Sequence, residues 1–414
     1  MLFGVVLSCI DEIELSTENF ESLLVVEATI TDQNIQQEIN LSRTYRLEEE
    51  EPRPESNAIV SVTDQTMNVY TFSEAEPGNY ISDIAFVAEP DKQYKLSITT
   101  SDGSKYASNE EILTTKTPMD ELFFERSFNE NGAEGVSVFV NTFDPLNETK
   151  YYRFEYEETY KIVAPLYSPE EFVPNDIQFP ILQEDIPFPI GDAEAALDFL
   201  GEIKLRDEQE LICYNTNVSN SEIITSTVDF TEDRLDKFRV QFLNRNNYII
   251  SHRYSILVRQ YIQSREAHVF YETLKNFSES ENILSQNQPG FLEGNLFSED
   301  NKGENVFGFF EVSSVDVKRI YFNYEDLFPG EELPPYYTSC DDFFAPGMFV
   351  EDFAHNLINS PLLNFINNGF QFFYENEDFS GSILDEVGPL VLVLEPCGDC
   401  TFLGDNNIPE FWEE

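Results

Sequence analysis

Residues 23–31 read LLVVEATIT, a stretch in which β-type or small side chains at Val25, Ala28 and Ile30 interleave with polar ones. Alternation of this kind is typical of a strand that buries one face. Similar segments follow at 38–41, 59–63, 68–72, 80–87, 94–99 and 112–115, separated by turn sequences such as EPGN at 76–79, EPD at 89–91 and SDG at 101–103. Short strands at this spacing predict a β-sandwich over residues 22–117.

The strand patterns continue through residues 118–414, which predict a larger β-rich domain with long loops. Its candidate strands lie at 135–142, 151–160, 223–230, 238–243, 248–262, 305–312, 318–323 and 387–394. Residues 164–191 contain six prolines, at positions 165, 169, 174, 180, 187 and 189. Because proline cannot donate to a sheet ladder, we expect this segment to form a long loop or a sheet edge.

One segment has a helical period instead. Apolar side chains at helical spacing are Ala267, Phe270, Tyr271, Leu274 and Phe277. Ser264 stands where an N-cap is expected, so a helix should begin just after it. We expect its aromatic stripe to pack in the core rather than bind a ligand. The predicted fold class is therefore mainly β, with an N-terminal sandwich followed by a larger β-rich domain that carries one prominent amphipathic helix.

The chain is strongly acidic. It has 414 residues with 78 acidic and 24 basic side chains, a formal net charge of −54. Such a surface repels nucleic acid phosphates and anionic lipid headgroups, so these partners are disfavoured, and it attracts cations or basic protein surfaces. Solubility alone is the simpler explanation of the charge. The 41% hydrophobic and 14% aromatic content indicates packed cores rather than disorder over most of the chain.

The first fourteen residues read MLFGVVLSCIDEIE. The apolar run from Leu2 to Leu7, closed by the small residue Ser8, has the pattern of a secretory signal and is too short to span a bilayer. Because the sequence VLSC at 6–9 resembles a lipobox, we expect a lipoprotein signal peptide over residues 1–8 and lipidation of Cys9, for example by palmitate. A disordered N-terminus that carries a cysteine by chance is the alternative.

Residues 9–21 are polar and acidic, and we expect them to form a tether between the anchor and the sandwich. Asp11, Glu12 and Glu14 directly follow Cys9 and resemble the export signal of Bacteroidota lipoproteins that reach the cell surface. These residues predict an outer-membrane, lipid-anchored protein that is exposed at the cell surface.

Four further cysteines are candidates for disulfides, namely Cys213, Cys340, Cys397 and Cys400. An even number outside the cytoplasm favours disulfides, but four cysteines allow three pairings and the sequence does not choose among them. Cys397 and Cys400 have thioredoxin-like spacing. A strand precedes this pair and a turn follows it, which favours structural disulfides over a redox or zinc site because a reactive thiol needs a helix N-terminus.

Other site chemistry has weak support in the sequence. No two of His252, His268 and His355 have the spacing of metal ligands, and neither a glycine-rich phosphate loop nor a nucleophile elbow is present. Calcium is a minor possibility at the acidic segments 299–301 with Glu304, or at 341–342, although neither matches a calcium-loop pattern. Nothing marks the pair of carboxylates that a glycosidase needs. We therefore assign no catalytic residue, no metal ligand and no cofactor other than the lipid on Cys9.

Several segments, taken in order, resemble one protein family. They are LLVVE at 23–27, ITD at 30–32, LSR at 41–43, EPGNY at 76–80, YKL at 94–96, REA at 265–267, PG at 289–290, EGN at 293–295, GFF at 308–310, CGDC at 397–400, Gly404 and PEFW at 409–412. Their order is similar to that in the Bacteroidota lipoprotein family catalogued as DUF4249, a domain of unknown function, over nearly the whole chain after Cys9.

The resemblance implies an outer-membrane lipoprotein with an N-terminal immunoglobulin-like or transthyretin-like domain. It also implies frequent association with TonB-dependent outer-membrane receptors, but no established reaction. We therefore expect a non-enzymatic lipoprotein that docks on a β-barrel partner such as a TonB-dependent channel, for substrate capture or barrel capping. The alternatives are an accessory subunit of outer-membrane protein assembly or secretion machinery, and a glycan-acting enzyme.

Overall fold

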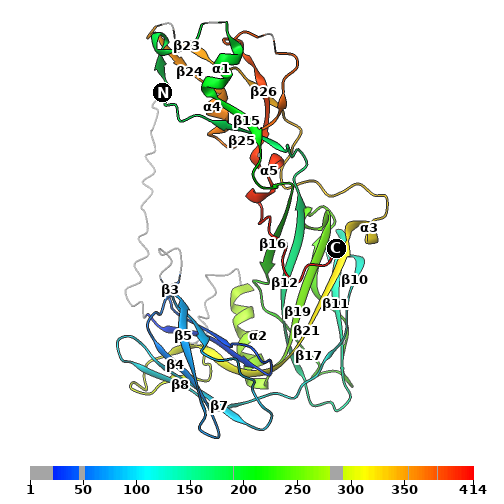
Figure 1. The fold of residues 1–414 in the computed structure, drawn as a ribbon. Helices are drawn as coiled ribbons and strands as arrows, with labels where there is room; N and C mark the ends of the chain where they lie inside the picture. The colour runs from blue at the N-terminus through cyan, green and yellow to red at the C-terminus, as the bar shows by residue number, and fades with distance from the viewer. Residues whose placement is uncertain (1–21, 46–51, 190, 280–291, 353, 380) are drawn as a thin grey trace, which may run out of the picture.

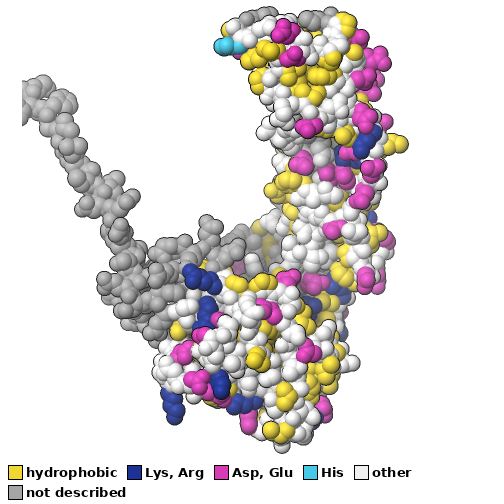
Figure 2. All heavy atoms as spheres, turned by 60° about the vertical axis from the view of Figure 1, so that its left-hand side comes forward, with side chains coloured by type: hydrophobic (Ala, Val, Ile, Leu, Met, Phe, Trp, Pro, Cys, Tyr) yellow, Lys and Arg dark blue, Asp and Glu magenta, His cyan; other side chains and the backbone are white. Residues whose placement is uncertain are grey.

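The computed structural model describes residues 22–45, 52–189, 191–279, 292–352, 354–379 and 381–414. The chain forms three packed units, which we name the sandwich, the body and the head (Figure 1; Figure 2 shows the same molecule with all heavy atoms). The sandwich is built on residues 24–112, the body on 119–163 and 212–323, and the head on 170–205 and 344–394. The predicted fold class is confirmed, because strands make up most of the regular structure in all three units.

Among the described residues from 24 to 112, nine short strands build the sandwich. They are β1 (Leu24–Thr31), β2 (Glu38–Arg43), β3 (Arg53–Pro54), β4 (Ile59–Asp64), β5 (Val69–Glu76), β6 (Asn79–Ser82), β7 (Gln93–Thr99), β8 (Lys105–Ser108) and β9 (Glu111–Ile112). In β1, Leu24, Val26, Ala28 and Ile30 are buried in the sandwich core, as the alternation predicted. The expected strand at 80–87 was too long, because β6 ends at Ser82. The Ser82 hydroxyl donates a hydrogen bond to the carbonyl of Ile84, two residues further along the chain.

The sandwich and the body share one long strand, β21 (Val306–Asn323). Its first part runs parallel to β1 from Val306 to Ser313, and its second part pairs antiparallel with β19 (Arg253–Ile262) from Ser314 to Asn323. The sequence predicted two separate strands here, at 305–312 and 318–323. Because one strand serves both units, they form a continuous fifteen-stranded sheet.

The sandwich also receives β20 (Leu296–Ser298), which pairs with β8. Next to β20, the side-chain amide of Asn295 donates to the carbonyl of Phe310 and accepts from its N–H, both at 2.8 Å. Leu296, Val306 and Phe310 therefore lie in the same core as β1, although they come almost two hundred residues after the other sandwich strands.

The body adds a second sheet to the shared one. β10 (Met119–Phe128), β11 (Glu134–Asp144) and β18 (Asp233–Asn244) form this sheet, and β12 (Tyr151–Val163), β16 (Ile212–Val218), β17 (Ile223–Ser226), β19 and β21 belong to the shared sheet. Residues of both sheets, among them Val138, Tyr152 and Ile256, form one core. The predicted strand at 248–262 begins only at Arg253, because the Asn247 side chain caps a 3-10 turn, η2 (Tyr248–Ile250). α3 (Tyr324–Leu327) follows β21.

The head packs two distant segments around its own core. Its elements are β13 (Glu170–Pro174), β14 (Ile181–Leu182), η1 (Gln183–Asp185), α1 (Ala193–Leu200), β15 (Gly201–Leu205), β22 (Phe344–Pro346), β23 (Val350–Asp352), β24 (Leu357–Asn359), α4 (Pro361–Ile366), β25 (Phe370–Glu375) and β26 (Val387–Leu394). β26 is the buried strand predicted at 387–394 and lies between β22 and β25. The described part of the proline-rich segment 164–191 contributes the short strands β13 and β14, each at the edge of a small sheet as its prolines predicted, and the 3-10 turn η1.

The predicted helix is α2 (Arg265–Glu279), and the hydroxyl of Ser264 accepts a hydrogen bond from the N–H of Ala267 at 3.1 Å. Ala267 and Phe270 are buried against β21, as expected. The rest of the stripe differs from the prediction, because Tyr271 and Leu274 also line a hollow and Phe277 is 37% exposed.

Candidate functional site

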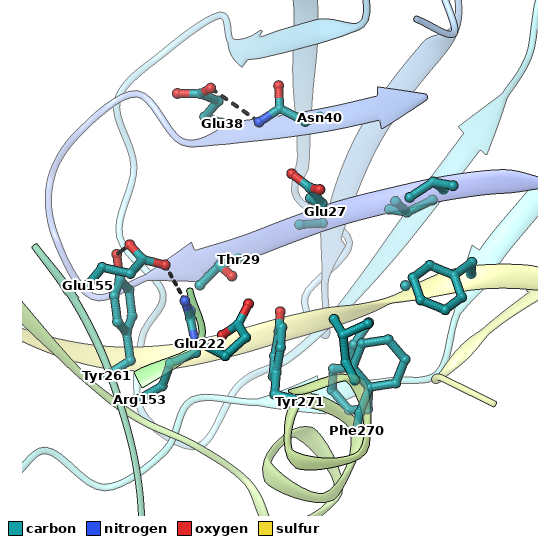
Figure 3. A pocket seen from close by; sticks show the side chains of 17 residues that line it. Glu27, Thr29, Glu38, Asn40, Arg153, Glu155, Glu222, Tyr261, Phe270 and Tyr271 are labelled. Atoms are coloured by element: carbon teal, nitrogen blue, oxygen red, sulfur yellow. Dashed lines mark hydrogen bonds and ion pairs between the residues drawn. The ribbon is translucent and has the colours of Figure 1, made fainter. Parts of the chain in front are cut away.

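A groove lies where the sandwich, the body and α2 meet, and it encloses a volume of about 340 Å³ (Figure 3). β1 and β2 supply its floor, α2 one wall, and β12 and β19 one end. Its lining residues are Val25, Val26, Glu27, Ala28, Thr29, Glu38, Asn40, Arg153, Glu155, Glu222, Tyr261, Phe270, Tyr271, Leu274, Phe307, Gly308 and Phe309. The mixture of carboxylates, one guanidinium and aromatic rings makes this hollow a candidate binding site.

Strand alternation explains why charged side chains reach the floor. Since Val26 and Ala28 of β1 are buried in the sandwich core, Glu27 projects from the opposite face of the same strand. Glu38 and Asn40 of the neighbouring β2 project from that face too, on either side of the buried Ile39. α2 packs on β21, where Phe270 contacts Phe309, and it also contacts β12 and β17.

Arg153 of β12 is the centre of the groove's closed end. Its side chain is nearly buried, with 6% exposed, and donates to the carboxylates of Glu155 and, at 3.2 Å, of Glu311. The guanidinium carbon lies 4.2 Å from the ring centroid of Tyr261 and 5.1 Å from that of Tyr271. Two carboxylates and two tyrosine rings therefore hold one cation at this end. Burial raises the pKa of Glu311, and Arg153 opposes this shift.

Two further carboxylates, those of Glu27 and Glu222, face the same space (Figure 3). Partial loss of water raises the pKa of Glu27, although its side chain remains exposed to the groove. Burial also raises the pKa of Glu222; Arg153 opposes this, and repulsion by Glu155 and Glu27 adds to it. These carboxylates therefore lie in surroundings that disfavour their negative charge.

The groove continues into a second hollow of about 550 Å³. The two share Glu27, Glu38, Asn40, Glu155 and Glu222. The second hollow extends along residues 218–222 to Arg259 of β19. The shared carboxylates thus lie midway along a longer channel, which gives space for an extended ligand.

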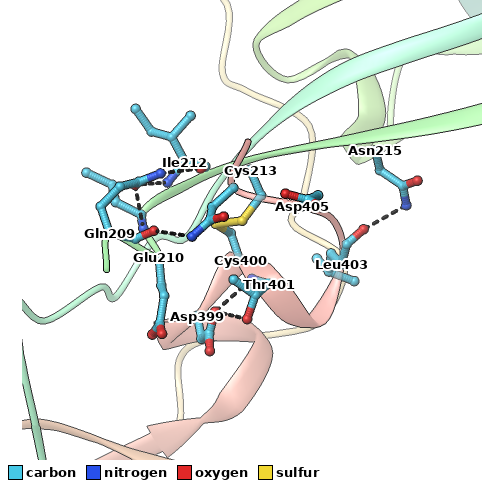
Figure 4. Close-up of a disulfide and its surroundings, with 12 residues drawn as sticks. Gln209, Glu210, Ile212, Cys213, Asn215, Asp399, Cys400, Thr401, Leu403 and Asp405 are labelled. Atoms are coloured by element: carbon cyan, nitrogen blue, oxygen red, sulfur yellow. Dashed lines mark hydrogen bonds between the residues drawn. A yellow bond between two sulfur atoms is a disulfide. The ribbon is translucent and has the colours of Figure 1, made fainter. Parts of the chain in front are cut away.

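The four candidate cysteines form two disulfides at the junction of body and head. Cys213 bonds to Cys400, and Cys340 bonds to Cys397. The first disulfide attaches the returning chain to the edge strand β16 (Figure 4). Around it, the N–H of Cys400 donates to the carbonyl of Glu210 at 2.9 Å, and the amide of Asn215 donates to the carbonyl of Leu403 at 2.7 Å. α5 (Glu395–Gly398) and η3 (Cys400–Phe402) carry the CGDC sequence. The disulfide prediction is borne out, and the structure supplies the pairing.

The other predicted residues lie away from the groove or outside the described part of the chain. Cys9, Asp11, Glu12 and Glu14 lie outside the described residues. In the first calcium candidate, Asp300 accepts from the N–H of Lys105 and Glu304 accepts from the hydroxyl of Tyr106, which are structural roles. In the second, Asp341 accepts from the hydroxyl of Ser339. Among the described residues, no three His, Cys, Asp or Glu side chains are grouped as a metal site requires.

The three histidines are far apart in the chain and have separate environments. His268 on α2 contacts the Tyr151 ring and Gln263, and burial lowers its pKa. Burial also lowers the pKa of His252, at the start of β19. His355 pairs with Asp352 at 2.8 Å on the head.

The fold and the groove define a class of protein: a mainly β chain of sandwich, body and head, with two disulfides and a charged, aromatic groove between the first two units. The family described as "Domain of unknown function (DUF4249)" matches residues 10–319, which is more than half of the chain. The chain therefore belongs to the DUF4249 family. The match includes every residue that lines the groove, and it ends before the second segment of the head. No curated protein matches the sequence.

Sequence reasoning did not find the groove. Its carboxylates are single residues in separate segments, at 27, 38, 155 and 222, among 78 acidic side chains. The sequence contained one signal of the site, Arg153 inside the strand predicted at 151–160. Because a buried arginine needs acidic partners, an arginine in a strand of this kind indicates that carboxylates lie nearby.

Proposed function

We propose that this protein is a lipid-anchored binding protein of the outer membrane that captures a substrate for a β-barrel partner, such as a TonB-dependent channel. The groove carries the proposal, because it is a preformed hollow with charged and aromatic walls held between two rigidly connected units. Such a hollow is suited to hold a ligand, and this favours substrate capture over barrel capping.

The cell compartment is inferred from the cysteines. Structural disulfides persist in oxidising compartments, and two of them tie the body to the head. The sequence VLSC at 6–9, followed by an acidic segment, adds the lipid anchor on Cys9 and surface export. Within the described ranges, no helix is long and apolar enough to cross a bilayer.

The barrel partner is inferred from the resemblance to the DUF4249 family. Affinity purification of the full chain from detergent-solubilised outer membranes tests it. We expect one β-barrel protein to be recovered in near-equal amount, and recovery of the lipoprotein without any barrel would contradict the proposal. Recovery of assembly machinery instead would favour the alternative of an accessory subunit.

The anchor is tested with Cys9→Ser. This variant should lose incorporation of a labelled fatty acid and leave the membrane fraction, because acyl chains provide the membrane affinity. Cys340→Ser in the same cells is the matched control, since it removes a cysteine from the Cys340–Cys397 disulfide and should still be labelled. Labelled Cys9→Ser protein in the membrane fraction would exclude position 9 as the lipidation site.

A further inference from the structure

The groove contains more hydrogen-bond acceptors than its own donors can satisfy. Glu155 pairs with Arg153 and accepts a hydrogen bond from the hydroxyl of Tyr261 at 2.9 Å. Glu38 accepts a hydrogen bond from the side-chain amide of Asn40 at 3.3 Å. Among the described residues, no hydrogen bond or ion pair reaches the carboxylates of Glu27 or Glu222. A ligand that fits this space should therefore bring donors and positive charge.

The closed end of the groove shows how such a charge is held in this protein. Arg153 places its guanidinium against the rings of Tyr261 and Tyr271 and pairs with Glu155 and Glu311. The carboxylates of Glu27 and Glu222 line the same space beside Tyr271 (Figure 3), and Arg153 and Lys275 attract the charge of Glu222.

We propose that this groove binds an organic cation, an alkylammonium or guanidinium group, between the carboxylates of Glu27 and Glu222 and the aromatic wall of α2. The inference rests on the proposed function, for which it names the class of substrate. Its hollow of about 340 Å³ lies within the range of ligand sites, and the adjoining hollow accommodates the chain that carries the cation. An ammonium or guanidinium offers donors and no acceptor, which matches the free groups.

The basic group can come from a peptide side chain or from a free polyamine, and binding measurements separate these sources. Isothermal titration of the full chain would use capped hexapeptides of alanine with one central lysine, arginine or norleucine, and also spermine and calcium chloride. We expect the lysine or arginine peptide, or spermine, to bind at least tenfold tighter than the norleucine peptide, because a hydrogen-bonded charge contributes about 1.5–3 kcal/mol. Binding of the peptides indicates a peptide source, and binding of spermine alone indicates a polyamine.

Two variants test the residues. Glu27→Gln and Glu222→Gln should each weaken cation binding at least fivefold, whereas Glu377→Gln, an exposed position on the head, removes the same charge and should leave binding unchanged. The proposal is overturned if the norleucine peptide binds as tightly as the lysine peptide, or if no basic probe binds. It is also overturned if calcium binds and no organic cation does, or if both groove variants bind the cation as tightly as the wild type does. Co-purification of the barrel tests the proposed function separately, so a wild type that binds no basic probe but still forms the barrel complex would reject this inference alone.

A second measurement, thermal unfolding of a Glu222 variant, tests whether the carboxylates repel each other in the ligand-free protein. The groups that face Glu222 are Glu27 of β1, Glu38 of β2, Arg153 and Glu155 of β12, Arg259 and Tyr261 of β19, and Tyr271 and Lys275 of α2. The raised pKa of Glu222 means that the folded protein binds its proton more readily than the unfolded chain does, so stability increases as pH falls through that pKa.

Glu222→Gln should therefore be more stable than the wild type at pH 7. The two should converge below about pH 4, the range in which an unfolded glutamate is protonated. Thermal unfolding followed by circular dichroism measures this difference. A variant that is less stable at pH 7 would show that Glu222 has partners that satisfy its charge, and this would contradict the proposed site.

Discussion

Removing the disulfide between Cys213 and Cys400 should destabilise the body, and its effect should exceed that of removing the other disulfide. The two cysteines are 187 residues apart, and closing a loop of that length removes unfolded-chain entropy worth about 5 kcal/mol at 25 °C. The separation of 57 residues between Cys340 and Cys397 gives about 4 kcal/mol. Native disulfides usually contribute about 2–4 kcal/mol, because unfolded chains retain some structure.

The surroundings of the two disulfides increase the difference. Cys213 and Cys400 are fully buried in the body core, and the chain beyond Cys400 is bonded to β16. Cys340 lies half-buried in the loop that leads from the body to the head. We therefore expect Cys213→Ala with Cys400→Ala to lower the free energy of unfolding by about 3–4 kcal/mol, and Cys340→Ala with Cys397→Ala by about 2 kcal/mol.

The single tryptophan is a suitable probe of this effect. The Trp412 ring lies 4.9 Å from the ring of Tyr214, the residue after Cys213, so its fluorescence reports on the edge of the body. In a urea titration, the first variant should unfold about 1 M earlier than the wild type, given a dependence of about 3 kcal/mol per molar urea. Wild-type protein reduced with dithiothreitol keeps its sulfur atoms but loses both disulfides, so it should unfold at least as early as the first variant. An unchanged midpoint, or a larger effect of the Cys340–Cys397 pair, would refute the reasoning.

Three further substitutions probe the groove and the sandwich. Arg153→Met should cost about 3–5 kcal/mol of stability because it leaves Glu311 buried without its cation, and Arg153→Met with Glu311→Leu should recover most of this loss in chemical denaturation. Gly308→Ala should cost about 3 kcal/mol or more, since its Cβ would lie 2.0 Å from the carbonyl oxygen of Val26 at a φ of +132°. Gly303→Ala should change the melting temperature little, because its Cβ would meet the Asn301 side chain at an ordinary contact distance of 3.6 Å. Burial opposes ionisation of Asp64, but hydrogen bonds from the turn after it lower its pKa to about 2. The free energy of unfolding of the wild type should therefore fall by about 1–2 kcal/mol as pH falls from about 4 to about 2. In urea titrations, Asp64→Asn should be less stable than the wild type by this contribution at pH 7 and should match it at pH 2. Equal stability of Asp64→Asn and the wild type at pH 7 would contradict that assignment.

The sequence predicted the elements whose pattern is local. β1 and β26 lie at their expected positions to within one residue, and α2 begins directly after its predicted cap at Ser264. The sequence did not predict that β21 is one strand across two units. The segment between its two predicted parts, residues 313–317, is interrupted by Ser313, Ser314 and Asp316, which are favourable in turns. In the structure the serine hydroxyls bond the carbonyls of Ile262 and Thr115, so tertiary contacts satisfy them within the strand.

The candidate site was hidden for a related reason. Glu27 and Glu222 are almost two hundred residues apart, and each has the ordinary appearance of a solvent-exposed carboxylate in an acidic chain. Only the topology brings them together, through pairings between β1 and β21 and between β21, β19 and β12. The disulfides were easier to predict, because an even number of cysteines favours them, but their pairing also depends on the route of the chain between the body and the head.

The shared strand also determines how rigid the groove can be. Its floor belongs to the sandwich and its closed end to the body, so a flexible link between these units would let the carboxylates move apart and weaken any site built between them. β21 prevents this, because its backbone is hydrogen-bonded to β1 along the floor and to β19 behind Arg153 without a break at Ser313 and Ser314. A ligand entering the groove therefore meets carboxylates and rings that are already in position, and little of its binding free energy is needed to order the protein. The head contributes no residue to the lining of the groove, so the geometry of the groove depends on the sandwich and the body.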